Sequence, residues 1–225
     1  EAAARLENFT AAAQELGTEA PPTFVRFGGI HERPIEEVAP GLPALWAGKA
    51  KVEIKPTANS TGRRAALAGW LASDDNPLTA RVFVNRVWSQ YFDKGIVSTV
   101  ADFGRAGQKP THPELLDYLA TDFVKNGWSV KRLHKQILLS AVYRQDSSER
   151  QDVVKVDPEN QLLAVFPRKR LEAEQIRDSL LAASGKLEDR IGGPAVFPPI
   201  PSNMNAGNLW TPTRDPHEAN RRSVY

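Results

Sequence analysis

The strongest constraint on the fold is a series of amphipathic segments between residues 76 and 143, each with signals that start or end a helix. The segment NPLTARVFVNRVWSQYF opens with Asn76, a good N-cap residue, followed by a proline that suits the first helical position. The segment PTHPELLDYLATDFVKNGW contains Thr111 and Glu114 at capping-box spacing, and Ser129 precedes the apolar-striped segment VKRLHKQILLSAVY. Helices with such stripes bury them against one another, so the pattern predicts a helical core.

Outside this core the sequence predicts further helices, a short strand and long loops. Residues 61–72 follow a Ser/Thr cap, and residues 168–184 carry an apolar stripe and end at a glycine. TFVRF, residues 23–27, alternates like a strand, whereas residues 31–46 are broken by prolines and predicted to be irregular. The Ala-rich residues 1–16 predict another helix. The expected fold class is mainly α, a compact multi-helix domain with a small β element and long Pro-rich loops.

Three regions of one domain are expected. Residues 1–60 contain the N-terminal helix, the short strand and a Pro-rich wrapping segment, and residues 61–150 form the helical core. Residues 151–225 add a helix and Pro/Gly-rich C-terminal loops. Val224 and Tyr225, which end the string RRSVY, favour extended structure, so we expect RRSVY to pair with TFVRF.

Composition excludes several classes of function. The 225 residues carry 29 Lys and Arg against 27 Asp and Glu, without the large basic excess of a nucleic-acid binder. The absence of cysteine excludes disulfides, Cys-ligated zinc, iron–sulfur clusters and covalent haem attachment within these residues. No apolar run is long enough to span a membrane, and residues 1–16 lack the apolar core of a signal peptide. We expect no metal site and no cofactor in this chain.

Three residues are candidates for catalysis, although no complete catalytic motif is present. His217 lies between Asp215 and Glu218 in TRDPHEANRR, which could supply an acid–base pair, although a solvated polar loop is the commoner outcome. Asp102 belongs to ADFGRAG, which contains the DFG tripeptide of protein kinases without any other kinase motif. Asp102 therefore is free to pair or to cap a turn. Glu174 is a candidate catalytic carboxylate on the 168–184 helix.

Arg81 and Asn85 are candidate binding residues that lie four positions apart on one flank of the predicted helix. Neighbouring helices should cover this flank, and a buried guanidinium needs an acidic partner. We therefore expect Arg81 to pair with Asp102, Glu174 or Asp178, and Asn85 to join the same network. A structural lock and a ligand-lining role are both open.

Arg177 and Asp178 are the other candidate binding residues. With Arg170 and Glu174 they share one face of the predicted 168–184 helix at spacings of three and four residues. Carboxylates beside two arginines are pushed towards ionisation, which favours a structural ion network over a catalytic acid.

Two further kinds of residue have alternative interpretations. Trp46 and Trp210, in predicted loops, would suit stacking on sugar rings, although a buried anchoring role is more common. His134 lies among apolar residues at helical spacing, so we expect a buried imidazole that bonds to a carbonyl or a carboxylate.

Several long strings resemble a known family. NPLTARVFVNRVWSQYFDKGIVSTVADFG, PTHPELLDYLATDFVKNGWSVKRLHKQILLSAVYRQDS and RKRLEAEQIRDSLLAASGKL, with a later GGP, resemble the planctomycete-specific domain of unknown function called PSD-one. TFVRFGGIHERPIEEVAPGLPAL resembles the same family, so the resemblance extends over nearly the whole chain. It implies a large exported protein, often with cytochrome c-like modules upstream and sugar-binding domains nearby. It also implies that the family pattern continues beyond RRSVY and that this chain is truncated there.

Two functional interpretations remain open. In the first, the chain is a non-catalytic binding or scaffold module of an exported, extracytoplasmic multidomain protein. Its partners are then other domains of the same polypeptide, including a cytochrome-like domain, or a polysaccharide. In the second, it is an extracytoplasmic enzyme that acts on complex carbohydrate, with Asp102, Glu174, His217 and Arg81 lining one cleft. The resemblance assigns no catalytic residue, so convergence of these side chains in one pocket would favour the enzyme.

Overall fold

The computed structural model describes residues 17–47, 52–192, 195–200 and 210–223. The described chain is mainly helical with one small antiparallel sheet, which confirms the predicted fold class. It divides into two compact units, residues 1–167 and 168–225, and the predicted three-region division stays a prediction. Within the described part of the chain, none of the helices combines the length and the apolar character that crossing a membrane requires.

The first unit contains a two-stranded antiparallel hairpin, in which β1 (Thr23–Arg26) pairs with β2 (Pro34–Val38). The prediction that residues 31–46 are irregular was therefore wrong, because TFVRF pairs with β2, which lies within that stretch. The pairing of TFVRF with RRSVY stays a prediction, since RRSVY belongs to the second unit. Pro34 is compatible with the sheet because it occupies the first position of its strand. Val224 and Tyr225, at the end of RRSVY, lie outside the described residues.

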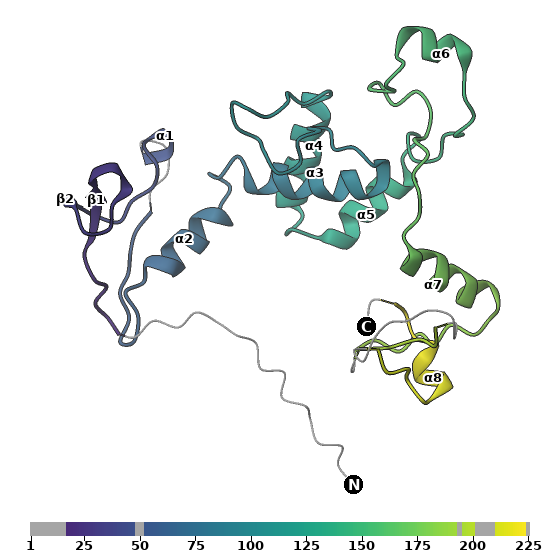
Figure 1. The fold of residues 1–225 in the computed structure, drawn as a ribbon. Coiled ribbons are helices and arrows are strands. Elements are labelled where there is room, and N and C mark those ends of the chain that lie inside the picture. Colours follow the sequence, from purple (N-terminus) through teal and green to yellow (C-terminus); the bar gives the residue numbers. More distant parts are fainter. Residues whose placement is uncertain (1–16, 48–51, 193–194, 201–209, 224–225) are drawn as a thin grey trace. The chain divides into compact units, whose positions relative to one another are not determined.

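Three helices form the core of the first unit. Helix α3 (Thr79–Phe92) packs against α4 (Pro113–Lys125), and α5 (Val130–Leu139) contacts both, as Figure 1 shows. Burial of their apolar side chains supplies the main driving force for folding of this unit. The buried apolar residues of this core are Ala80, Val84, Trp88, Phe92, Ile96, Val97, Leu116, Leu119, Ala120, Phe123, Leu133 and Ile137.

The predicted cap at Ser129 is confirmed, and Asn76 caps the turn that leads into α3. Asn76 Oδ1 accepts hydrogen bonds from the backbone N–H groups of Leu78 and Thr79, although α3 begins at Thr79, two residues later than predicted, with Leu78 at its N-cap. Ser129 Oγ accepts a hydrogen bond from the backbone N–H of Arg132 in the first turn of α5. Each cap satisfies N–H groups that have no partner within the helix.

The predicted capping box at Thr111 and Glu114 is wrong. Helix α4 begins at Pro113, its N-cap is His112, and no side chain caps it. The N–H and the hydroxyl of Thr111 both donate to the carbonyl of Ile96, at 2.9 and 3.3 Å. The Thr111 hydroxyl therefore bonds to a backbone carbonyl distant in sequence and not to the N-terminus of α4, where the capping motif placed it.

The remaining helical elements lie outside this three-helix core. In the first unit they are η1 (Phe27–Gly29), α1 (Ala44–Ala47), α2 (Arg63–Leu71) and α6 (Gln151–Val156). In the second unit they are α7 (Ala173–Ala183) and α8 (Pro216–Ala219). Gly185, at a φ of 69°, follows α7 as the sequence predicted, and the helix predicted for residues 1–16 lies outside the described residues.

Asp122 joins α4 to α5 through a polar cluster. Its carboxylate accepts two hydrogen bonds from the guanidinium of Arg132, at 3.0 and 3.2 Å. It also accepts one from the Gln136 amide and one from the Asn126 amide. The Arg132 hydrogen bonds, the Arg132 charge and the two amides together hold the pKa of Asp122 below its ordinary value, against a smaller opposing effect of desolvation.

Stability of the helical core is therefore expected to fall in acid partly through Asp122. A carboxyl whose pKa is lower in the folded state stabilises the fold above the ordinary Asp pKa of about 3.9. That contribution is lost as the pH falls towards the folded-state pKa. Urea denaturation between pH 7 and pH 2 should show wild type above Asp122→Asn at pH 7 and the difference shrinking below about pH 4. A difference that stays constant down to pH 2 would contradict this assignment.

Candidate functional site

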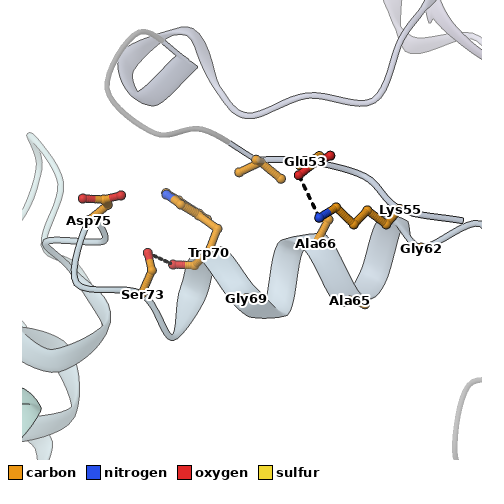
Figure 2. Close-up of a pocket in the computed structure, with 10 residues that line it drawn as sticks. Glu53, Lys55, Gly62, Ala65, Ala66, Gly69, Trp70, Ser73 and Asp75 are labelled. Carbon is orange, nitrogen blue, oxygen red and sulfur yellow. Dashed lines mark hydrogen bonds and ion pairs between the residues drawn. The ribbon is translucent and has the colours of Figure 1, made fainter.

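A groove with a volume of about 380 Å³ runs along helix α2 of the first unit, as Figure 2 shows. Its volume lies in the range of small-molecule sites, about 300–1,000 Å³. The floor consists of small residues at helical spacing, namely Gly62, Ala65, Ala66 and Gly69. The walls and the rim are formed by Val52, Glu53, Lys55, Trp70, Ser73 and Asp75.

The shape of the groove depends on Gly62. Its φ of 74° lies in the left-handed region, and a Cβ at this position would lie 2.2 Å from the backbone carbonyl oxygen of Lys55. Glycine therefore lets the wall segment approach the start of α2. Two hydroxyls support this turn: Ser60 Oγ accepts from the Gly62 N–H, and Thr61 Oγ1 accepts from the Arg63 N–H.

Trp70 provides the largest side chain of the groove. Its ring packs against Trp46, with ring centroids 6.4 Å apart and planes tilted by 52°. The indole Nε1–H is buried and has no hydrogen-bond acceptor among the described residues. Ser73 donates its hydroxyl proton to the Trp70 carbonyl, so the oxygen lone pairs of Ser73 can still accept. Because this N–H is buried, a ligand acceptor reaches it only after a small movement of the groove wall, and then satisfies a donor that otherwise destabilises the fold.

The charged groups of the groove differ in whether they have an ion-pair partner. Lys55 and Glu53 form an ion pair at 3.0 Å, with 74% and 75% of their side chains exposed. Such an exposed pair contributes little to stability and can rearrange around a ligand. The exposed carboxylate of Asp75 has no ion-pair or hydrogen-bond partner in the part of the chain that the structure describes.

The sequence predicted the helix at residues 61–72 but not the groove on it. The signal available was a row of small residues, Gly62, Ala65 and Gly69, on the same helix as Trp70. Small residues at helical spacing also occur where two helices pack closely, so the pattern alone does not distinguish a groove from a helix contact.

Asp102, the candidate from ADFGRAG, holds a turn in the first unit. Its Oδ1 accepts a hydrogen bond from the Gly104 N–H at 2.7 Å, and its carbonyl accepts from the Thr99 hydroxyl. A Cβ on Gly107 would lie 2.2 Å from the Asp102 carbonyl oxygen, so the loop is tightly closed. The capping role suggested by the sequence is thus confirmed, and the catalytic role stays a prediction.

Glu174 and His217 belong to the second unit. Both side chains are exposed, and neither has an ion-pair or hydrogen-bond partner among the described residues. The loop expected around His217 instead contains helix α8, in which Asp215 Oδ1 accepts from the His217 N–H. No three His, Asp or Glu side chains of the described residues gather as a metal site. The catalytic role of these two residues stays a prediction.

Arg81 has a different acidic partner from the predicted ones. Its Nε donates to Asp117 Oδ1 of helix α4 at 2.7 Å, and not to Asp102 of the same unit. The guanidinium is not fully buried, since 34% of the Arg81 side chain and 58% of the Asp117 side chain are exposed. The prediction of Asp102 was wrong because the approach of α4 to α3 brings an unforeseen carboxylate to this flank. Arg81 also lines two cavities, of about 330 and 190 Å³.

Asn85 is fully buried and does not join Arg81. Its Nδ2 donates to the Val97 carbonyl at 2.9 Å, and its Oδ1 accepts from the Val97 N–H at 2.8 Å. A Cβ on the neighbouring Gly95 would lie 2.6 Å from Asn85 Nδ2, so the loop passes directly over the amide. The predicted shared network was therefore wrong, and Asn85 fixes the loop that follows α3.

Arg177 and Asp178 bind the C-terminal segment of the second unit to helix α7. The Arg177 guanidinium donates to the carbonyls of Ala219 and Arg221 and to the Ser223 hydroxyl. Asp178 Oδ1 accepts from the N–H and the hydroxyl of Ser223, at 2.9 and 2.8 Å. The Nη1 atom of Arg177 lies 3.5 Å from Oδ1 of Asp178. These contacts satisfy backbone carbonyls near the end of α8, which supports the structural interpretation.

The predicted charged face is smaller than expected, because helix α7 begins at Ala173 and Arg170 precedes it. Glu174 lies in the first turn of α7 and is not among the groups that bond Arg177 or Asp178 in the described residues. A capping box of Glu172 and Gln175 starts the helix instead.

His134 and Trp210 are both half-buried. His134 Nδ1 lies 2.6 Å from the hydroxyl of Tyr91, so its partner is a phenol instead of the predicted carbonyl or carboxylate. Trp210 Nε1 donates to the Pro198 carbonyl, and its ring meets Phe197 edge to face. Trp210 thus anchors a loop, whereas the indole N–H of Trp70 is buried and lacks an acceptor among the described residues.

The sequence model of PSD1, a protein family of unknown function (DUF1553), matches residues 63–225. This range contains helices α2 to α8 and more than half of the chain. The chain belongs to the PSD1 family. The match confirms the resemblance to PSD-one, while the resemblance of TFVRFGGIHERPIEEVAPGLPAL lies outside the matched range. No curated protein and no solved structure matches the chain. The PSD1 match includes the α2 side of the groove and excludes the wall at residues 52–55.

Proposed function

We propose that this PSD1 chain is a non-catalytic binding module that engages polysaccharide through the groove on α2. The observation that carries the proposal is the buried indole N–H of Trp70, which lines the groove without an acceptor among the described residues. Sugars present ring hydroxyls and apolar ring faces together, and tryptophan combines an apolar body with a polar N–H. The groove and the proposed ligand are therefore chemically matched.

The hydrogen-bonding groups around Trp70 support the same ligand class. The indole supplies a donor, while Ser73 Oγ and the Asp75 carboxylate supply acceptors. Lys55 and Glu53 add a donor and an acceptor at the other wall, where their exposed pair can exchange partners. A hydroxyl both donates and accepts, so a polyhydroxylated ligand can satisfy all of these groups.

The proposal places the module in an exported, extracytoplasmic multidomain protein, whose other domains, including a cytochrome-like one, are its partners. Membership of the PSD1 family and the domain associations of the resembling proteins support this context. The binding role requires no cofactor in this chain.

Binding should depend on Trp70 and not on an α2 side chain that does not line the groove. We expect Trp70→Ala to weaken retention by an immobilised panel of cellulose, xylan, mannan and laminarin at least about tenfold, since an aromatic contact and a hydrogen bond are both lost. Leu67→Ala is the matched control, because Leu67 lies on α2, is 47% exposed and does not line the groove.

Three outcomes would contradict the proposed function. If no polysaccharide of the panel retained the wild-type protein, the proposed binding role would be wrong. If the protein steadily released soluble sugar from a bound polysaccharide, it would be an enzyme and not a non-catalytic module. If Trp70→Ala and Leu67→Ala were both retained as tightly as wild type, the binding site would lie outside the groove.

A further inference from the structure

We infer that the α2 groove selects uncharged polysaccharides and rejects acidic ones; this inference rests on the proposed function. Among the described lining residues, two carboxylates, Glu53 and Asp75, accompany a single ammonium group, that of Lys55. A ligand that brings a further negative charge therefore meets an excess of like charge.

The lysine is already engaged with one of the two carboxylates. Lys55 Nζ lies 3.0 Å from Glu53 Oε2, and Figure 2 places Trp70 between this pair and Asp75. A sugar carboxylate or sulfate at the indole would thus face the Asp75 carboxylate while the ammonium group remains paired with Glu53. Separating that pair to serve the ligand would leave Glu53 as a second repelling charge.

Hydrogen-bonding capacity points to the same selection. The Trp70 N–H lacks an acceptor among the described residues, whereas the Asp75 carboxylate can only accept hydrogen bonds. Two neighbouring ring hydroxyls supply one acceptor and one donor. An ionised carboxylate or sulfate supplies acceptors alone, so it can satisfy Trp70 but not Asp75.

The test compares polymers that share a backbone and differ in charge. The probes are polygalacturonate with its carboxyl-reduced form, and sulfated carrageenan with its desulfated form. At low salt we expect at least one uncharged member to bind about tenfold more tightly than its acidic counterpart, in a Trp70-dependent manner. Because salt screens charges, the difference should narrow at 0.5 M NaCl, where the Debye length is only about 4 Å.

Substitution of Asp75 separates charge selection from simple shape preference. Asp75→Asn should reduce the discrimination against the acidic member of the pair. Asp74→Asn, a change at the adjacent carboxylate that does not line this groove, should leave the discrimination intact. Trp70-dependent binding of an acidic polymer as tight as that of its uncharged counterpart would overturn the inference and leave the proposed function standing. Binding of neither pair and of no uncharged polymer on the panel would overturn both.

Discussion

Replacing Asn85 with alanine is expected to lower the free energy of unfolding of the helical core by about 2–5 kcal/mol. The amide is fully buried and satisfies both the N–H and the carbonyl of Val97. Alanine would leave these two backbone groups without their partner in a region where Val97 itself is 2% exposed. Urea denaturation followed by circular dichroism measures the effect.

Arg81→Ala is the matched comparison on the same flank of α3. Its pair with Asp117 is partly exposed, so the loss should be less than about 1 kcal/mol. The order of the two effects follows burial, since Asn85 is fully buried and Arg81 is partly exposed. An Arg81→Ala variant less stable than Asn85→Ala would contradict the assignment of the structural lock to the amide.

Replacing Gly62 with alanine is expected to disrupt the start of α2 and with it the groove. The left-handed conformation costs a non-glycine residue about 1–2 kcal/mol, and the new Cβ would also collide with the Lys55 carbonyl. Hydrogen-exchange protection of the α2 amides should fall at least about tenfold, and binding to the polysaccharide panel should weaken with it.

Gly69→Ala tests the same substitution without the conformational cause. A Cβ on Gly69 meets no atom within 4 Å, and Ala is favoured over Gly in a helix by about 0.8–1.0 kcal/mol. Protection of the α2 amides should therefore rise in this variant. Equal protection in Gly62→Ala and wild type would show that the groove does not depend on the turn at Gly62.

Local signals in the sequence predicted the helical core well, because they act between residues close in the chain. Asn76 caps the turn that leads into α3, and Ser129 caps α5. The capping prediction for Thr111 was wrong for a physical reason. Its hydroxyl donates a hydrogen bond to the carbonyl of Ile96, which is distant in sequence, and does not cap the helix. The acidic partner of Arg81 was not predicted for a similar reason, since only the packing of α4 on α3 brings Asp117 within reach.

The candidate groove was less predictable than the fold. Trp46 is a candidate for stacking on sugars, but its ring packs against Trp70, which lines the groove. The groove exists because Gly62 lacks a Cβ where the preceding segment approaches, and this contact is a property of the folded chain. A sequence pattern records the glycine but not the carbonyl that it accommodates.

The most direct test of the account is the indole N–H of Trp70 itself. The chain has 5 tryptophans, so a ¹H–¹⁵N spectrum should contain one indole signal for each, and Trp70→Phe identifies the signal of Trp70 by its loss. Titration with an uncharged oligosaccharide from a retained polysaccharide should shift this signal and slow its exchange with water, because the ligand oxygen becomes its acceptor. An unchanged Trp70 signal at saturating ligand would contradict the central claim that the α2 groove binds polysaccharide.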